Sequence, residues 1–200
     1  IRSYLVKDIR ERLKKLNPDI PAGKIIINAT HTHSGGDLYA DGSEMFACDV
    51  PRMSGKEYSD FVAGQAADAI AEAWKNRKSG GVAWGYGYAV VSHQRRVVYF
   101  DDFGKRKGGS GTTGFAANGH GVMYGNTNDP QFSHYETGAD AFVNLLYTFD
   151  AEGKLTGAII NVPAPSQNSE HISKLSSDFW NDVRVALKKE YGDISILPQC

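Results

Sequence analysis

The chain has 200 residues, of which 41% are hydrophobic and 22% are charged, and its formal net charge is −1. This length and composition are typical of a globular domain with a core of its own. The near-zero net charge shows no excess of basic residues of the kind that binds nucleic acid. No apolar run has the length needed to span a membrane.

The cysteines and the chain ends give little information about cellular location. Cys48 and Cys200 lie far apart in the sequence, and two alternatives stay open: one long-range disulfide bridge or two free thiols. The chain starts at Ile1, almost directly at a helix, and stops just after a strand-like run at 194–197. We therefore expect one α/β domain, residues 1–200, that is part of a longer chain, and the missing signal segment does not argue against export.

The first predicted elements are a helix and a buried strand. Ser3 can cap a helix over 3–15, in which Leu5, Ile9 and Leu13 recur every fourth residue and mark the buried stripe. Asn17 and Pro18 end this helix. The apolar run that follows predicts a strand over 24–29.

A pair of histidines follows this strand in the segment Ala29-Thr-His-Thr-His-Ser-Gly-Gly36. His31 and His33 lie two residues apart, so an extended backbone points both to one face. This arrangement suits metal ligation or proton transfer. Two loop histidines bonded to backbone carbonyls would show the same spacing, and that alternative stays open.

An acidic loop over 34–53 and a helix come next. The carboxylates of this loop could complete a metal site, although ordinary turn chemistry is the favoured reading of Asp37, Asp41, Glu44 and Asp49. Ser54 and Glu57 form a capping box for a helix that runs to about Lys78. Its expected apolar face comprises Phe61, Val62, Ala66, Ala69, Ile70, Ala73 and Trp74, and its alanines allow close packing on a sheet.

The middle of the chain predicts two strands and a long irregular stretch. Alternation predicts a strand over 82–91, whose glycines indicate a close backbone or ligand, and a second strand covers 97–100. Arg95 between them is either an oxyanion or polar-substrate contact or, more commonly for such a position, a surface arginine. Residues 101–140 are expected to be irregular.

The last part predicts two strands, over 142–149 and 155–162, and a helix from Ser176 or Ser177 to Tyr191. The linker 163–170 follows a strand, as the histidine pair does. If the strands 24–29 and 155–162 share a sheet and run the same way, both loops lie at one edge. The residues brought together would then be His31, His33, Ser166, Gln167, Glu170 and His171. The fold class is α/β, with mixed sheets flanked by helices.

The run Thr30-His-Thr-His-Ser-Gly-Gly36 resembles the neutral ceramidase family in its N-terminal catalytic domain. A second stretch, over 142–161, looks like the strand–turn–strand pair of that family. The resemblance implies a ceramidase-like N-terminal-domain fold, with His31 as a zinc ligand and His33 beside the substrate. The sequence departs from the family at Ala164, where another zinc-binding histidine is expected, and His171 is a substitute candidate. The remaining family ligands, a Glu and a Tyr, would lie beyond this chain.

The implied activity is metal-dependent hydrolysis of an amide or ester bond in a small-molecule or ceramide-like lipid substrate, with zinc-bound water as the nucleophile. His33 and Arg95 are the candidate catalytic residues, Ser34, Ser166 and Gln167 the candidate substrate contacts, and His31 and His171 the candidate zinc ligands. The resemblance also implies a secreted or periplasmic protein, and the oligomeric state stays open. The alternative is a non-catalytic glycan- or lipid-binding module with a decayed metal site.

Overall fold

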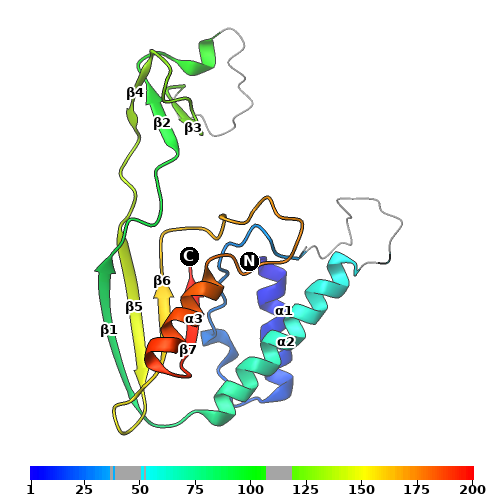
Figure 1. The fold of residues 1–200 in the computed structure, drawn as a ribbon. Helices are drawn as coiled ribbons and strands as arrows, with labels where there is room; N and C mark the ends of the chain where they lie inside the picture. The colour runs from blue at the N-terminus through cyan, green and yellow to red at the C-terminus, as the bar shows by residue number, and fades with distance from the viewer. Residues whose placement is uncertain (37, 39–50, 52, 107–118) are drawn as a thin grey trace. The chain divides into compact units, whose positions relative to one another are not determined.

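The computed structural model describes residues 1–36, 38, 51, 53–106 and 119–200 (Figure 1). The chain forms two compact units, which we describe separately. The first comprises Ile1–Gly85, Asn144–Asn161 and Pro165–Cys200, and the second comprises Tyr86–Val143 with Val162–Ala164. The predicted organisation, one α/β domain within a longer chain, stays a prediction.

The helical part of the first unit is built by α1 (Ser3–Leu16) and α2 (Gly55–Asn76). The predicted stripe Leu5, Ile9 and Leu13 is fully buried, but the N-cap is Arg2 rather than Ser3. The predicted capping box at Ser54 and Glu57 is present.

The predicted apolar face of α2 is confirmed in part. Val62, Ala66, Ile70 and Trp74 pack against the helical core, whereas Phe61, Ala69 and Ala73 are exposed. The fully buried hydrophobic residues, Ala63 and Ala67, were not among those predicted. The small alanines allow α2 to lie against α1, and they share one core cluster with the α1 stripe. The predicted packing partner, a sheet, is therefore replaced by a helix.

A mixed four-stranded sheet has the order β1 (Gly81–Tyr88), β5 (Phe142–Phe149), β6 (Leu155–Asn161) and β7 (Ser195–Gln199). β5 and β6 pair antiparallel, and β6 and β7 pair parallel. The parallel pair needs a crossover, which α3 (Trp180–Tyr191) supplies. This combination of mixed sheets and helices confirms the predicted α/β class.

The predicted strand over 24–29 is not formed. A 3₁₀ turn, η1 (Ala22–Lys24), leads into an extended segment outside the sheets. Ile25 and Ile27 pack against the helical core, whereas Ile26 is 86% exposed. The apolar run that indicated a buried strand is therefore half-buried, and its hydrophobic side supports the helices.

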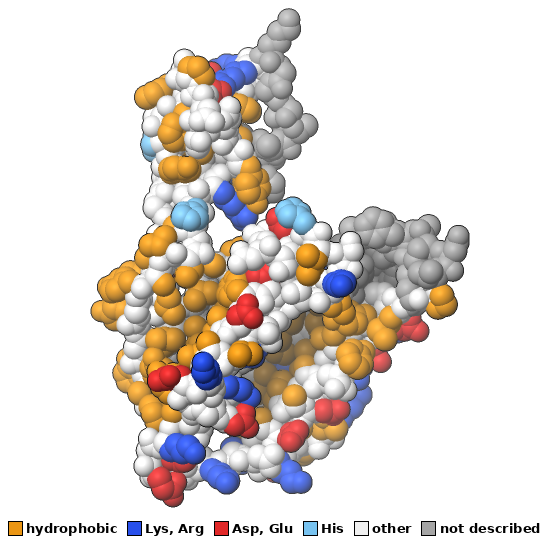
Figure 2. Space-filling model, in the orientation of Figure 1, with side chains coloured by type: hydrophobic (Ala, Val, Ile, Leu, Met, Phe, Trp, Pro, Cys, Tyr) orange, Lys and Arg blue, Asp and Glu red, His pale blue; other side chains and the backbone are white. Residues whose placement is uncertain are grey.

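Two predictions, one about β1 and one about α3, are also corrected. A Cβ built at Gly85 or Gly87 of β1 would meet no atom within 4 Å among the described residues, so no described backbone segment lies close to these glycines, and the predicted ligand contact stays a prediction. Hydrophobic side chains lie exposed on this strand, among them Trp84. Figure 2 shows hydrophobic side chains gathered over β1. α3 begins at Trp180 rather than at the predicted Ser176 or Ser177, and Trp180 is its buried residue.

The second unit contains a three-stranded antiparallel sheet. Its order is β3 (Gly121–Met123), β2 (Arg96–Tyr99) and β4 (Phe132–Tyr135). The stretch 101–140, predicted to be irregular, therefore holds two strands and the short 3₁₀ helix η2 (Phe103–Lys105). These strands are too short for a periodic signal, and the core cluster of Val97, Tyr99 and Val122 stabilises them.

In the described part of the chain, no helix combines the length and the apolar character that crossing a bilayer requires.

Candidate functional site

The histidine loop and the linker after β6 lie against each other in the first unit. The backbone N–H of His33 donates to the carbonyl oxygen of Ser166 at 3.1 Å. The Ser166 hydroxyl donates to the carbonyl oxygen of Thr30 at 2.7 Å, and the Ser34 hydroxyl donates to that of Ser169 at 2.8 Å. The predicted meeting of the two loops is therefore present, although direct hydrogen bonds produce it and not a shared sheet.

The segment before α3 also forms hydrogen bonds with the histidine loop. The Thr32 hydroxyl donates to the Ser176 carbonyl oxygen, and the Ser176 N–H donates to the Ser34 carbonyl oxygen, both at 3.0 Å. A Cβ at Gly36 would overlap the ring of Tyr58 in α2, so glycine allows the loop to pass close to this helix. The backbone that holds His33 is thus fixed by several independent contacts.

The imidazole of His33 faces a carboxylate from the linker. Its Nδ1 lies 3.1 Å from Oε2 of Glu170, and both side chains are about two-thirds buried. The Gln167 amide nitrogen donates to the same Oε2 at 3.1 Å and lies 3.4 Å from His33 Nδ1. With its proton on Nδ1, neutral His33 donates to Glu170, and its Nε2 keeps a lone pair for a reacting group.

His31 adopts a backbone conformation that is uncommon outside glycine. Its φ is +54°, in the left-handed region, and its ring stacks on that of His33 with 5.2 Å between centroids and 19° between planes. The backbone is therefore not extended here, yet the two rings still lie together. Strained conformations of this kind concentrate at functional sites.

The donor groups do not form a complete zinc site. Among the described residues, no group of three His, Cys, Asp or Glu side chains could hold a metal ion. The rings of His31 and His33 are stacked and nearly parallel, and the side chain of His171 is 92% exposed, with its Nε2 3.7 Å from Glu170 Oε1. A zinc ion needs four converging ligands, so these residues alone do not fit it.

The serine hydroxyls at the site are already used by the protein. Ser166 is 1% exposed and Ser34 is 7% exposed, and each donates to a backbone carbonyl of the opposite loop. Their role as substrate contacts stays a prediction, whereas their role in joining the loops is visible. Gln167 is more accessible, and its amide belongs to the His33–Glu170 cluster.

Asp178 organises the turn that presents Glu170. Its carboxylate accepts from the N–H of Ser169 at 2.6 Å and from the N–H of Phe179 at 2.9 Å, and its φ is +57°. Burial favours the protonated form, but the N–H groups of Phe179, Ser169 and Asn168 outweigh it and lower the pKa of Asp178. Asp178 therefore stays ionised and holds the linker turn in place.

Arg95 belongs to the second unit. Its guanidinium donates to the hydroxyl of Tyr124 at 2.7 Å, and Tyr124 has a left-handed φ of +56°. Its proposed oxyanion contact stays a prediction. The acidic residues Asp37, Asp41, Glu44 and Asp49 and the thiol of Cys48 lie outside the described residues.

The sequence placed Glu170 near the site but gave it no role, and it missed Asp178 altogether. A signal for Glu170 was present, since Gln167 and Glu170 lie three residues apart and a single turn brings such side chains together. Asp178 gave no comparable signal, because its partners follow from a turn that the sequence did not predict.

The solved structures that are similar to this chain include two ceramidase structures. A ceramidase complexed with C2 aligns with a TM-score of 0.60 and 18% identity, over 98% of this chain and 27% of that chain. The neutral ceramidase from Pseudomonas aeruginosa aligns with a TM-score of 0.59 and 18% identity, over the same shares. No family model matches the sequence, and no curated protein matches it either.

The structural neighbours confirm the fold that the histidine motif implied. The chain has the fold of one part of a ceramidase and spans 27% of the length of these enzymes. At 18% identity, this similarity establishes the fold and not the reaction, because one fold can host several activities.

Proposed function

We propose that this chain is the part of a ceramidase-like hydrolase that supplies its acid–base group, and that the bond cleaved is an amide or ester of a small-molecule or lipid substrate. The observation that carries the proposal is the 3.1 Å contact between His33 Nδ1 and Glu170 Oε2. A carboxylate at this position fixes the tautomer and orientation of an imidazole, as in hydrolytic triads. The fold of the ceramidase neighbours and the strained His31 backbone agree with it.

The chemistry follows from Nε2 of His33, which has no hydrogen-bond partner among the described residues. This nitrogen accepts a proton from an attacking water while the water oxygen bonds to the substrate carbonyl carbon. The protonated imidazole then gives that proton to the leaving amine or alcohol as the C–N or C–O bond breaks. Glu170 stabilises the imidazolium between the two steps, because its carboxylate lies against Nδ1.

The metal, the substrate class and the cellular location are further parts of the proposal. Zinc stays a prediction, since the described donors do not converge on a metal. A ceramide-like substrate is proposed from the neighbouring structures, as is secretion or location in the periplasm. Separation of culture medium, periplasm and cytoplasm, followed by immunodetection, tests the location.

The decisive experiment assays hydrolysis of fluorescent amides and esters by the longest natural polypeptide that contains this sequence. We expect His33→Gln to lower kcat/KM about 10²- to 10⁴-fold, the typical contribution of an acid–base group. Glu170→Gln should lower kcat with a smaller change in KM, because the imidazole loses its orientation but the substrate pocket remains.

Two exposed residues outside the cluster provide matched controls. His134→Gln and Glu152→Gln make the same chemical changes at exposed positions and should leave turnover unchanged. Turnover that survives His33→Gln at the wild-type rate removes His33 from the mechanism. A panel that gives no turnover by the wild-type protein, with or without added zinc, contradicts the hydrolase proposal itself.

A further inference from the structure

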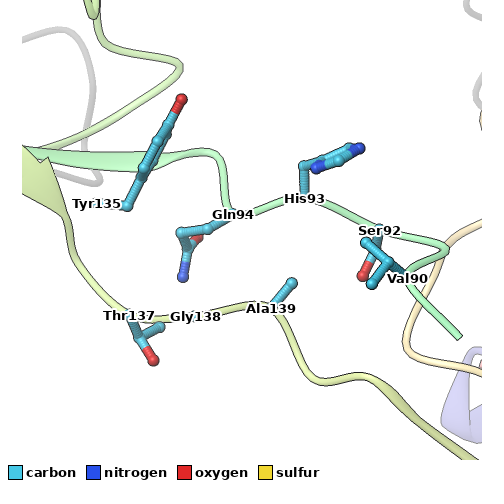
Figure 3. A pocket seen from close by; sticks show the side chains of 8 residues that line it. All are labelled: Val90, Ser92, His93, Gln94, Tyr135, Thr137, Gly138 and Ala139. Carbon is cyan, nitrogen blue, oxygen red and sulfur yellow. The ribbon is translucent and has the colours of Figure 1, made fainter. Parts of the chain in front are cut away.

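A pocket in the second unit forms where a β-ladder opens. At one end, the N–H of Ala89 donates to the carbonyl of Ala141 at 2.9 Å, and at the other end the N–H of Glu136 donates to that of Arg96 at 3.1 Å. Between these bonds, the described segments 90–95 and 137–140 exchange no backbone hydrogen bond. The opening holds a pocket of about 380 Å³ (Figure 3), lined by Val90, Ser92, His93, Gln94, Tyr135, Thr137, Gly138 and Ala139.

Apart from His93, the polar side chains of this pocket are amide and hydroxyl groups, and the Gln94 amide is held in place by the backbone. Gln94 Oε1 accepts from the N–H groups of Arg95 and Arg96 at 2.9 and 3.1 Å, which fixes the amide plane. The Gln94 amide nitrogen then points toward the opposite segment (Figure 3). Among the described residues, no lysine, arginine, aspartate or glutamate lines the pocket. His93 belongs to the lining, and in Figure 3 its ring extends away from the opposite segment.

An aromatic ring supplies the apolar part of the lining. Tyr135 is 50% exposed, and its ring lies edge-on to that of Phe132 with 5.7 Å between centroids. Phe132 in turn packs against the core of the second unit, so the position of the Tyr135 ring is supported by that core. A braced aromatic surface beside an amide and two hydroxyls suits a ligand that has both C–H faces and hydroxyl groups.

We propose that this pocket binds one uncharged sugar ring, such as a hexose unit. The volume lies within the usual range of small-ligand sites, about 300–1,000 Å³. A ring with a carboxylate or an ammonium group is disfavoured, because the described lining contains no lysine, arginine, aspartate or glutamate to replace its hydration. This proposal is independent of the hydrolase chemistry proposed for His33. The same ring occurs in free glycans and in the headgroups of glycolipids.

Nuclear magnetic resonance titration tests the site directly. Methyl glucoside and methyl galactoside are added at millimolar concentrations to the ¹⁵N-labelled protein, in parallel with glucuronate and glucosamine. We expect the neutral glycosides to shift the side-chain amide signals of Gln94 and the backbone amide signal of Gly138, and the charged sugars to bind at least about tenfold more weakly, which corresponds to about 1.4 kcal/mol.

Two glycines give a matched pair of variants. A Cβ at Gly138 or at Gly87 would meet no atom within 4 Å among the described residues, and neither glycine has a positive φ. Gly138→Val adds bulk to the pocket lining, whereas Gly87→Val makes the same change on β1 outside the pocket. We expect the first variant to lose the glycoside response and the second to keep it.

The results of these experiments decide whether the pocket binds a neutral sugar. The sugar assignment is overturned if neutral glycosides leave Gln94 and Gly138 unshifted, if Gly138→Val responds like the wild type, or if charged sugars bind equally well. The selectivity measurement needs only the wild-type protein, so it stands even where a variant does not fold. Sedimentation with phosphatidylcholine vesicles, with and without a glucosyl lipid, then distinguishes a headgroup from a free glycan as the source of the ring.

Discussion

At the scale of single residues, Asp178 is the clearest case of a buried charge with a defined task. It is 8% exposed, and it joins the turn at Ser169 to the start of α3 through backbone N–H groups. A carboxylate that accepts several N–H bonds stabilises the folded state only while it is ionised. The linker that presents Glu170 to His33 therefore depends on a charge that touches neither residue.

The expected effect of Asp178→Asn is a loss of about 1–3 kcal/mol of unfolding free energy near neutral pH, since charge-assisted hydrogen bonds are lost. The pKa of Asp178 is lowered in the folded state, so its contribution is complete above its unfolded value of about 3.9 and fades as the pH falls through the folded value. The stability difference between wild type and variant should therefore shrink in acid. Urea unfolding at several pH values measures it.

Exposed Asp19 provides the comparison for this experiment. Asp19→Asn should leave the unfolding free energy within about 0.5 kcal/mol of the wild type, as surface substitutions usually do. An Asp178→Asn protein that is as stable as the Asp19→Asn protein at neutral pH would show that the turn holds without the carboxylate.

At the scale of elements, the packing of α1 on α2 supports the histidine loop. Ile9 is 1% exposed and lies in the core cluster with Ala63 and Ala67. Ile25 and Ile27, in the segment that leads to His31, rest on the same cluster. The loop is therefore based on a helical core rather than on a strand.

Truncation of Ile9 to alanine should cost about 2–5 kcal/mol, because it removes buried methyl groups and leaves a cavity between the helices. Thermal or urea unfolding followed by circular dichroism measures this change. Leu16→Ala at the exposed end of α1 is the matched control and should cost less than about 1 kcal/mol. Equal costs at the two positions would mean that the helix pair is not the core described here.

At the scale of the whole molecule, the question is how a metal could be held. The chain covers 27% of the length of its ceramidase neighbours, and its described residues offer no three-ligand group. Any zinc bound to the natural polypeptide would therefore need ligands from outside the described residues in addition to His31. Ala164, where the family resemblance expects a histidine, is buried and has no donor atom.

We predict that the longest natural polypeptide containing this sequence retains zinc and that His31→Ala removes it. Elemental analysis of the purified protein after dialysis gives the ratio of metal to chain. His134→Ala, at an exposed histidine in the second unit, should leave that ratio unchanged. Zinc retained by the His31→Ala protein at the wild-type ratio removes His31 from the ligands.

The sequence by itself determined several local elements of this protein, although not the segment 24–29 or the strands β3 and β4. The stripe of Leu5, Ile9 and Leu13, the capping box at Ser54 and the antiparallel pair β5–β6 follow from periodicity, capping and turn residues close together in the chain. The histidine motif also indicated the fold that the ceramidase structures share.

Only the tertiary structure decided what those histidines contact. Gln167 and His33 are 134 residues apart, and their meeting with Glu170 depends on hydrogen bonds between two loops and on the strained turns at His31 and Asp178. The pocket in the second unit also depends on tertiary structure. It forms between the segment that joins β1 to β2 and the segment that joins β4 to β5, which are distant in the sequence. Local patterns report hydrophobic periodicity and turn chemistry, whereas a site depends on how separate segments pack.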